Sequence, residues 1–194
     1  RLPDHYFQGI GGGPGPIGIH EMAERLVNEG LFEGPVPRQH VSQNVEHHPI
    51  HSAWQAGRDH LAPEDFPEED VEVYSDYLLN KGPAYGQVGA VHDILKASNG
   101  QTYIVDRKDA MAARQTIESI EGIDIMTPGA VAAASLLQAV QTGTVKNDDC
   151  VLLNISGGGL KRLKDDIETR VLEPWLTVKK STAVASILEK MAPE

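Results

Sequence analysis

Two glycine clusters constrain the fold of this chain most strongly, because each lies between an apparent strand and an apparent helix. The first occupies residues 9–16 (GIGGGPGP) and the second residues 156–159 (SGGG). Glycine lets the backbone approach a ligand closely, and the free amides of the following helix add about half a positive charge. Two interpretations stay open, an anion-binding site or plain structural turns. In an open α/β sheet such a site would lie beyond the carboxyl ends of the strands.

Apolar runs and helical periodicity alternate along the sequence. We expect strands at residues 5–10, 38–45, 102–105 and 150–155, and helices at 17–28, 49–56, 87–97, 108–120, 128–141 and from Leu160. The continuous apolar run 151–153 predicts a strand covered on both faces. Thr127 before Pro128 predicts a helix start capped by the threonine hydroxyl. The alternation predicts an α/β fold with three αβα layers and a mostly parallel sheet, in a single domain over residues 1–194.

The composition argues against several classes of partner. The 194 residues carry a formal net charge of −11 without a cluster of Lys or Arg, so we expect neither nucleic acid nor an anionic membrane as a partner. No apolar stretch reaches the ~20 residues of a membrane span. The single cysteine, Cys150, predicts a cytoplasmic protein with a buried thiol. The chain starts at Arg1 without an initiator methionine and soon enters a strand, which predicts a piece of a larger protein.

Other chemically active side chains are better explained as ordinary surface groups. Three close histidines lack the cysteine or carboxylate spacing of a closed zinc site, so we expect a surface cluster and no metal; they are His47, His48 and His51. Four lysines lie in polar contexts without the desolvation that a reactive lysine needs; they are Lys81, Lys96, Lys108 and Lys146. The acidic residues 59–70 predict a solvated loop.

The glycine clusters do not fit the nucleotide-binding fingerprints, since neither is followed by Gly-Lys-Ser/Thr and the first lacks a G-x-G-x-x-G pattern with its acidic partner. The sequence instead resembles the fold-type II pyridoxal-phosphate enzymes, most closely cysteate synthase and its threonine synthase relatives. The similar segments run in family order over nearly the whole chain: residues 6–13 (YFQGIGGG), 40–44 (HVSQN), 52–54 (SAW), 121–125 (EGIDI), 130–136 (AVAAASL) and 151–159 (VLLNISGGG).

The resemblance implies a large-domain fold of this enzyme type and a set of residues around pyridoxal 5'-phosphate. The glycines of the first loop would hold the phosphate, and Ser156 would face the pyridine nitrogen. A neutral hydroxyl there would leave the nitrogen largely unprotonated, which favours elimination and replacement chemistry. Glu121 would lie in a segment that passes near the ring. The residues implied to bind the cofactor are Gly11, Gly12, Gly13, Gly15, Glu121, Ser156 and Gly157.

The resemblance also implies that this chain lacks one part of the active site. The Schiff-base lysine of the family precedes the phosphate loop and lies in residues that this chain does not contain. We therefore expect a partner that supplies it, either a lysine-bearing N-terminal portion or a second chain, with a homodimer as one arrangement. The implied substrate is a small activated amino acid, such as an O-phospho amino acid.

Two prolines depart from the family pattern. Pro14 and Pro16 stand where relatives commonly have a hydroxyl residue and a glycine, and each removes an amide donor. A hydrogen bond to a charged group contributes about 1.5–3 kcal/mol, so two lost donors would weaken phosphate binding. Three hypotheses follow: one piece of an enzyme for β-replacement or elimination, a non-catalytic binding or scaffold protein derived from such an enzyme, or a divergent enzyme that works without a lysine-bound cofactor.

Overall fold

The computed structural model describes residues 1–68, 71–170, 172–178 and 182–191. The chain divides into two compact units, Arg1–Arg162 and Leu163–Glu194. The sheet and the candidate site lie in the first unit, α6 (Leu160–Asp166) crosses the boundary, and α7 (Val184–Met191) lies in the second. The expectation of one domain over residues 1–194 stays a prediction.

The first unit is built on a parallel sheet of four strands in the order β3-β2-β1-β4. The strands are β1 (His5–Gly9), β2 (Arg38–Asn44), β3 (Gln101–Val105) and β4 (Val151–Leu153). Phe7 of β1 lies opposite His40 of β2 on one side and Leu153 of β4 on the other. Since β1 and β4 are parallel neighbours, their carboxyl ends lie side by side. Both glycine clusters therefore follow at the same end of the strands.

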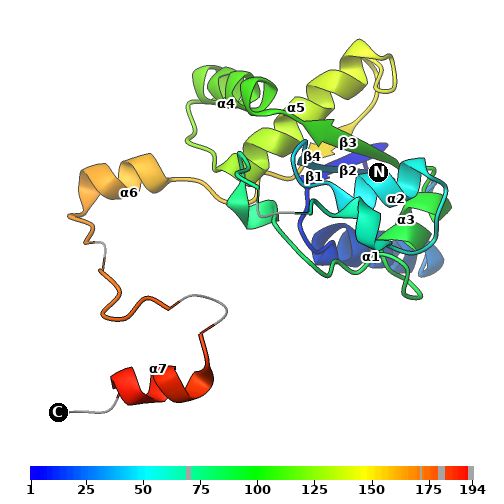
Figure 1. Ribbon diagram of the computed structural model, residues 1–194. Helices are drawn as coiled ribbons and strands as arrows, with labels where there is room; N and C mark the ends of the chain where they lie inside the picture. The colour runs from blue at the N-terminus through cyan, green and yellow to red at the C-terminus, as the bar shows by residue number, and fades with distance from the viewer. Residues whose placement is uncertain (69–70, 171, 179–181, 192–194) are drawn as a thin grey trace. The chain divides into compact units, whose positions relative to one another are not determined.

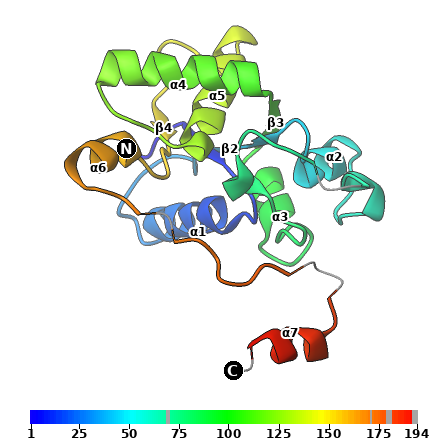
Figure 2. The same cartoon turned by 60° about the vertical axis from the view of Figure 1, so that its left-hand side comes forward.

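Helices cover both faces of the sheet (Figures 1 and 2). On one face α5 (Thr127–Gln141) packs against the strands, and α4 (Arg107–Glu121) packs on the outside of α5. On the other face lie α1 (Pro14–Asn28), α2 (Pro49–Gln55) and α3 (Val91–Ala97). Two short 3-10 turns, η1 (Pro63–Asp65) and η2 (Asp76–Leu78), lie in the long connection between α2 and α3. The predicted α/β class with a parallel sheet between helical layers is confirmed.

Small residues bring α5 close to the sheet. Every residue from Pro128 to Ser135 is buried, and five of these eight are alanine or glycine next to valine, proline and serine. Their short side chains let the helix axis approach strands that carry the larger Phe7 and Val105. The opposite core is filled by bulkier groups, among them Tyr85 and Leu95. Thus α5 holds the end of β1 at a fixed position beside the first glycine cluster.

Several element boundaries differ from the predicted ones for local reasons. The first helix begins at Pro14 instead of residue 17, because proline loses no hydrogen bond at the first helical position. The third begins at Val91, after a turn that includes Gly89 with a φ of 75°. The predicted cap at Thr127 is wrong: Met126 is the N-cap residue, and the Thr127 hydroxyl donates to Ser75 Oγ at 3.0 Å.

Two burial predictions near β4 are also wrong. This strand is at the end of the described sheet, and Leu152 keeps 46% of its surface exposed instead of being covered on both faces. Cys150 is exposed, because it precedes this edge strand and contributes only its backbone, whose N–H donates to Asp4 Oδ2 at 2.7 Å. In the part of the chain that the structure describes, no helix has the length and apolar character needed to cross a membrane.

The acidic connection is only partly solvated. Asp59 and Glu64 are exposed as predicted, but Asp65 is buried and forms a two-pronged ion pair with Arg58. The Asp65 carboxylate also accepts from the Ala62 N–H at 2.7 Å, which fixes the turn. Residues 69 and 70 of the predicted loop lie outside the described residues.

Candidate functional site

One cavity brings the two glycine clusters together. Its volume is about 390 Å³, within the range of about 300–1,000 Å³ that small-molecule pockets occupy. Four segments line it: residues 8–15 at the end of β1, the turn 77–80, Met126 with Pro128 at the start of α5, and Ser156 after β4. The cavity therefore lies beyond the carboxyl ends of β1 and β4, the place expected for one of the two open interpretations, an anion-binding site.

The first glycine loop turns sharply into α1. Gly13 adopts a left-handed conformation, with φ 93° and ψ 0°, and is the N-cap residue of the helix. Its carbonyl accepts from the Ile17 N–H at 3.3 Å. Pro14 and Pro16 occupy the first and third helical positions, so Gly15 alone carries an N–H among these three residues. The loop thus reaches the helix without strain, but the helix N-terminus offers few donors.

Four backbone amides of this loop are open, meaning that their N–H groups have no acceptor among the described residues. The N–H groups of Gly11, Gly12, Gly13 and Gly15 donate to none of the described residues. Backbone donors in a folded protein are almost always paired with protein, water or a ligand. Glycine also lets the loop pack against a neighbouring segment, since a Cβ on Gly11 would lie 3.1 Å from the Leu78 carbonyl oxygen. The four amides without a partner among the described residues suit an anion that accepts from several N–H groups.

The second glycine cluster is fixed against the start of α5. The Met126 N–H donates to the Gly157 carbonyl at 3.2 Å, and the Gly159 N–H donates to the Asp124 carbonyl at 3.1 Å. The Asp124 carboxylate accepts from the Lys161 N–H at 2.6 Å and from Arg114 at 2.8 Å. These contacts, the Lys161 N–H first, hold the pKa of Asp124 below its ordinary value. Ser156 is thereby placed on the wall of the cavity.

The structure groups most of the predicted cofactor residues and leaves two aside. Gly11, Gly12, Gly13, Gly15 and Ser156 all line the cavity. Glu121, the last residue of α4, is exposed and lies outside the lining.

Gly157 also lies outside the lining. It adopts a φ of 91°, and a Cβ there would lie 2.7 Å from Met126 Sδ, so it shapes the turn.

Several lining residues were not identified from the sequence, among them Gln8, Tyr77, Asn80 and Met126. Gln8 lies in the segment 6–13 that resembles the family, but no pattern marks its side chain as facing a ligand. Tyr77 and Asn80 come from a stretch without clear periodicity, and nothing local indicates that it crosses the glycine loop. Met126 precedes the predicted helix start. Their role depends on tertiary packing, which a single sequence does not display.

The histidine cluster is not on the surface as predicted. His47 is 3% exposed, and its Nε2 donates to the Asn80 carbonyl at 3.0 Å. His51 is half-buried, its Nδ1 is 2.8 Å from Thr102 Oγ1, and burial lowers its pKa. Among the described residues no group of three or more possible ligands could hold a metal ion. The four lysines are all exposed, which confirms their predicted role as solvated charges.

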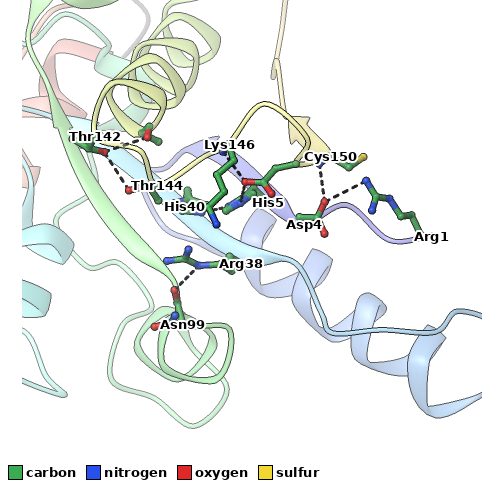
Figure 3. Close-up of polar contacts among 12 residues, drawn as sticks. Arg1, Asp4, His5, Arg38, His40, Asn99, Thr142, Thr144, Lys146 and Cys150 are labelled. Atoms are coloured by element: carbon green, nitrogen blue, oxygen red, sulfur yellow. Dashed lines mark hydrogen bonds and ion pairs between the residues drawn. The ribbon is translucent and has the colours of Figure 1, made fainter.

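A cluster of polar side chains lies at the opposite end of the strands, near the amino ends of β1 and β2 (Figure 3). His5 contacts Asp149 at 3.1 Å through Nε2 and His40 at 2.9 Å through Nδ1. Arg38 donates from Nε to the Asn99 carbonyl at 3.0 Å. Since these strands are parallel, this cluster is separated from the glycine-loop cavity by the length of the sheet. Its contacts join four segments of the chain.

Comparisons with known proteins give the ancestry of this arrangement. No protein-family model matches the chain. Cysteate synthases from Methanosarcina mazei and Methanosarcina acetivorans are 42% and 43% identical to it over 185 and 182 residues. The alignments cover 93% and 92% of this chain and 44% of each relative. The chain is homologous to the cysteate synthases. It spans less than half the length of these curated relatives.

Solved structures show the same fold at low identity. Serine racemase from Dictyostelium discoideum superposes with a TM-score of 0.59 and 17% identity, over 82% of this chain and 45% of that one. Maize serine racemase has a TM-score of 0.58 and 16% identity, over 84% and 47% of the two chains. A pyridoxal 5'-phosphate-dependent aspartate racemase gives 0.61 and 10%, over 81% and 44%. The fold is that of the fold-type II pyridoxal-phosphate enzymes.

The chemistry of the cavity fits that cofactor. The open amides of the first loop suit a phosphate, and the glycines let the loop pack closely against Leu78 and Asn80. Ser156 brings a neutral hydroxyl to the same cavity, and Met126 and Pro128 add apolar surface for an aromatic ring. A cation is absent from the described lining residues, so an anion here depends on neutral donors and the dipole of α1.

Proposed function

We propose that this chain is the cofactor-cradling part of a pyridoxal-phosphate enzyme that catalyses β-replacement or elimination on an activated amino acid, such as an O-phospho amino acid. One observation carries the proposal: the open amides of the first glycine loop and Ser156 lie around a single cavity. Homology to the cysteate synthases supports the cofactor class. We further propose that the protein works in the cytoplasm.

The residues of this chain would bind and orient the cofactor. The amides of Gly11, Gly12, Gly13 and Gly15 would hold the phosphate, and the Ser156 hydroxyl would lie at the pyridine nitrogen. Bound pyridoxal phosphate supplies an electron sink for the carbanion at the substrate α-carbon. A serine there provides no negative charge to stabilise a protonated ring nitrogen, which moderates that electron withdrawal.

The remaining assignments stay part of the proposal. Gly157 would shape the turn that presents Ser156, and Glu121 would belong to the segment leading to Met126 rather than contact the ring itself. The Schiff-base lysine would come from a lysine-bearing N-terminal portion of the protein or from a second chain, with a homodimer as one arrangement. The same part of the protein would supply most of the substrate pocket.

Titration of the intact gene product with pyridoxal phosphate tests the proposal. We expect the absorbance band of lysine-bound cofactor to appear and to saturate, since the lysine and the cradle are then both present. The matched control is the intact gene product carrying Ser156→Ala, which keeps the lysine and the glycine loop. It should show the band with weaker affinity, because one hydrogen bond of about 1 kcal/mol is lost. A wild-type protein without the band at excess cofactor contradicts the proposal.

A second candidate function is a non-catalytic binding or scaffold protein derived from such an enzyme. The observation that favours it is the pair Pro14 and Pro16, which leaves Gly15 as the only donor among the first three residues of α1. The same titration separates the two candidates, because a scaffold that has lost the cofactor would show neither the band nor saturable binding of pyridoxal phosphate.

A further inference from the structure

Two side-chain amides lie beside the glycine loop. Asn80, from the turn after η2, lies beside Gly12, and Gln8, from β1, lies beside Gly15. Both residues line the cavity. The Asn80 Nδ2 atom lies 2.9 Å from the position that a Cβ on Gly12 would take, and the Gln8 amide would clash with a Cβ on Gly15. Gly12 and Gly15 therefore make room for these two polar side chains.

The Asn80 side chain is oriented with its amino group available. Its Oδ1 accepts from the Gly82 N–H at 2.8 Å, so Nδ2 is the opposite end of the amide. Nδ2 donates to none of the residues that the structure describes. The backbone is also fixed, because the buried His47 donates to the Asn80 carbonyl at 3.0 Å. The Asn80 Nδ2 donor is thus held at the cavity wall without an acceptor among the described residues.

The Gln8 side chain is likewise oriented with its oxygen paired and its amino group available. Its Oε1 accepts from the Tyr6 hydroxyl at 2.7 Å. Tyr6 in turn accepts from Asn154 Nδ2 at 2.7 Å, which directs its own hydrogen toward Gln8. Burial raises the pKa of Tyr6, so the hydroxyl keeps that hydrogen. The Gln8 Nε2 has no acceptor within the described chain, and it lies where α1 begins.

We propose that Gln8 and Asn80 donate to the cofactor phosphate and replace the two amides that Pro14 and Pro16 remove. The inference rests on the proposed function and names two further phosphate-binding residues for it. Tyr6 and His47 are positioning residues that do not line the cavity: Tyr6 holds the Gln8 side-chain amide, and His47 holds the Asn80 backbone from which the other amide extends. Neutral donors suit this site, since cations are missing from its described lining.

The test uses the variants Asn80→Asp and Gln8→Glu in the intact gene product, with pyridoxal phosphate and pyridoxal as probes. Both variants keep an oxygen that accepts from the Gly82 N–H or the Tyr6 hydroxyl, so the local fold is preserved. An anionic oxygen in place of a donor should raise the Kd of pyridoxal phosphate about tenfold or more. Pyridoxal lacks the phosphate, so its Kd should change by less than about twofold.

The matched control is Asn147→Asp, an exposed asparagine outside the cavity that receives the same change of charge. Its Kd values for both probes should equal those of the wild type. Two results overturn this inference alone: variants that bind pyridoxal phosphate as tightly as the wild type, or variants that lose both probes equally, which indicates a structural role. A wild-type protein that binds no pyridoxal phosphate overturns the inference together with the proposed function.

Discussion

At the scale of single residues, Gly13 determines how the first glycine loop enters α1. Its φ of 93° is a conformation that other residues rarely adopt, and a Cβ there would clash with Val91 Cγ2 on α3. We expect Gly13→Ala to lower the free energy of unfolding of the intact protein by about 2 kcal/mol or more, since strain and overpacking add. Urea denaturation followed by circular dichroism measures this.

Gly18 provides the control within the same helix. A Cβ there meets no atom within 4 Å, and its φ lies outside the left-handed region. Gly18→Ala should therefore raise the free energy of unfolding by about 0.5–1 kcal/mol, through higher helix propensity. Equal effects of the two substitutions would contradict the assigned role of Gly13.

The residues that sequence could identify are those whose role follows from local pattern. Gly11, Gly12 and Gly13 stand between a strand and a helix, and Ser156 opens the second cluster, so pattern and resemblance pointed to them. Asn80 could not be found in this way, because the Gly82 N–H orients its side chain and His47 from a different segment holds its backbone. For the same reason the buried His47 looked like a surface residue in sequence.

At the scale of elements, a buried polar chain joins the amino halves of three strands. Asp149 contacts His5 of β1, which contacts His40 of β2, and His40 Nδ1 lies 3.1 Å from the Tyr103 hydroxyl of β3. The His40 ring stacks on Phe7 with 4.2 Å between the ring centroids. Burial, with His5 and Arg38 nearby, lowers the pKa of His40 to about 3. The neutral imidazole is therefore part of the folded sheet.

This depressed pKa predicts a pH dependence of stability. Between about pH 6.5 and pH 3 the unfolded chain binds a proton at His40 that the folded chain does not bind. The stabilisation is complete above pH 6.5 and decreases as the pH falls, by about 2 kcal/mol between pH 6.5 and 5. In His40→Gln the decrease over this range should be smaller by that amount, as measured by urea denaturation at each pH.

The control for this prediction is His60→Gln, because the His60 side chain is 69% exposed and pairs only with the exposed Asp59 among the described contacts. The loss of stability from pH 6.5 to 5 should stay larger in His60→Gln than in His40→Gln. An unchanged slope in His40→Gln would show that His40 titrates with an ordinary pKa in the folded protein.

The order and type of the helices and strands up to α6 followed from the sequence, whereas their ends and α7 did not. Apolar periodicity located all four strands and the main helices. The helix starts shifted where proline or a glycine turn decided the boundary, as at Pro14 and Val91. The exposure of β4 could not be predicted, because the apolar run 151–153 is the same for an edge strand and a covered one.

At the scale of the whole molecule, the described chain leaves apolar surface that suits a further part of the protein. The last strand of the sheet, β4, exposes 46% of Leu152, and α5 exposes 43% of Leu137 and 48% of Val140. Exposed apolar groups at an edge strand are a common site of contact with another segment. This agrees with the proposal that a lysine-bearing N-terminal portion or a second chain completes the active site.

The position of the cofactor phosphorus in a crystal structure of the intact gene product, grown with pyridoxal phosphate, tests the central claim most directly. The account predicts a phosphate whose oxygens accept from the loop amides of Gly11, Gly12 and Gly13, with the pyridine nitrogen at the Ser156 hydroxyl. A cofactor bound elsewhere, or a phosphate that does not contact the first glycine loop, would contradict it.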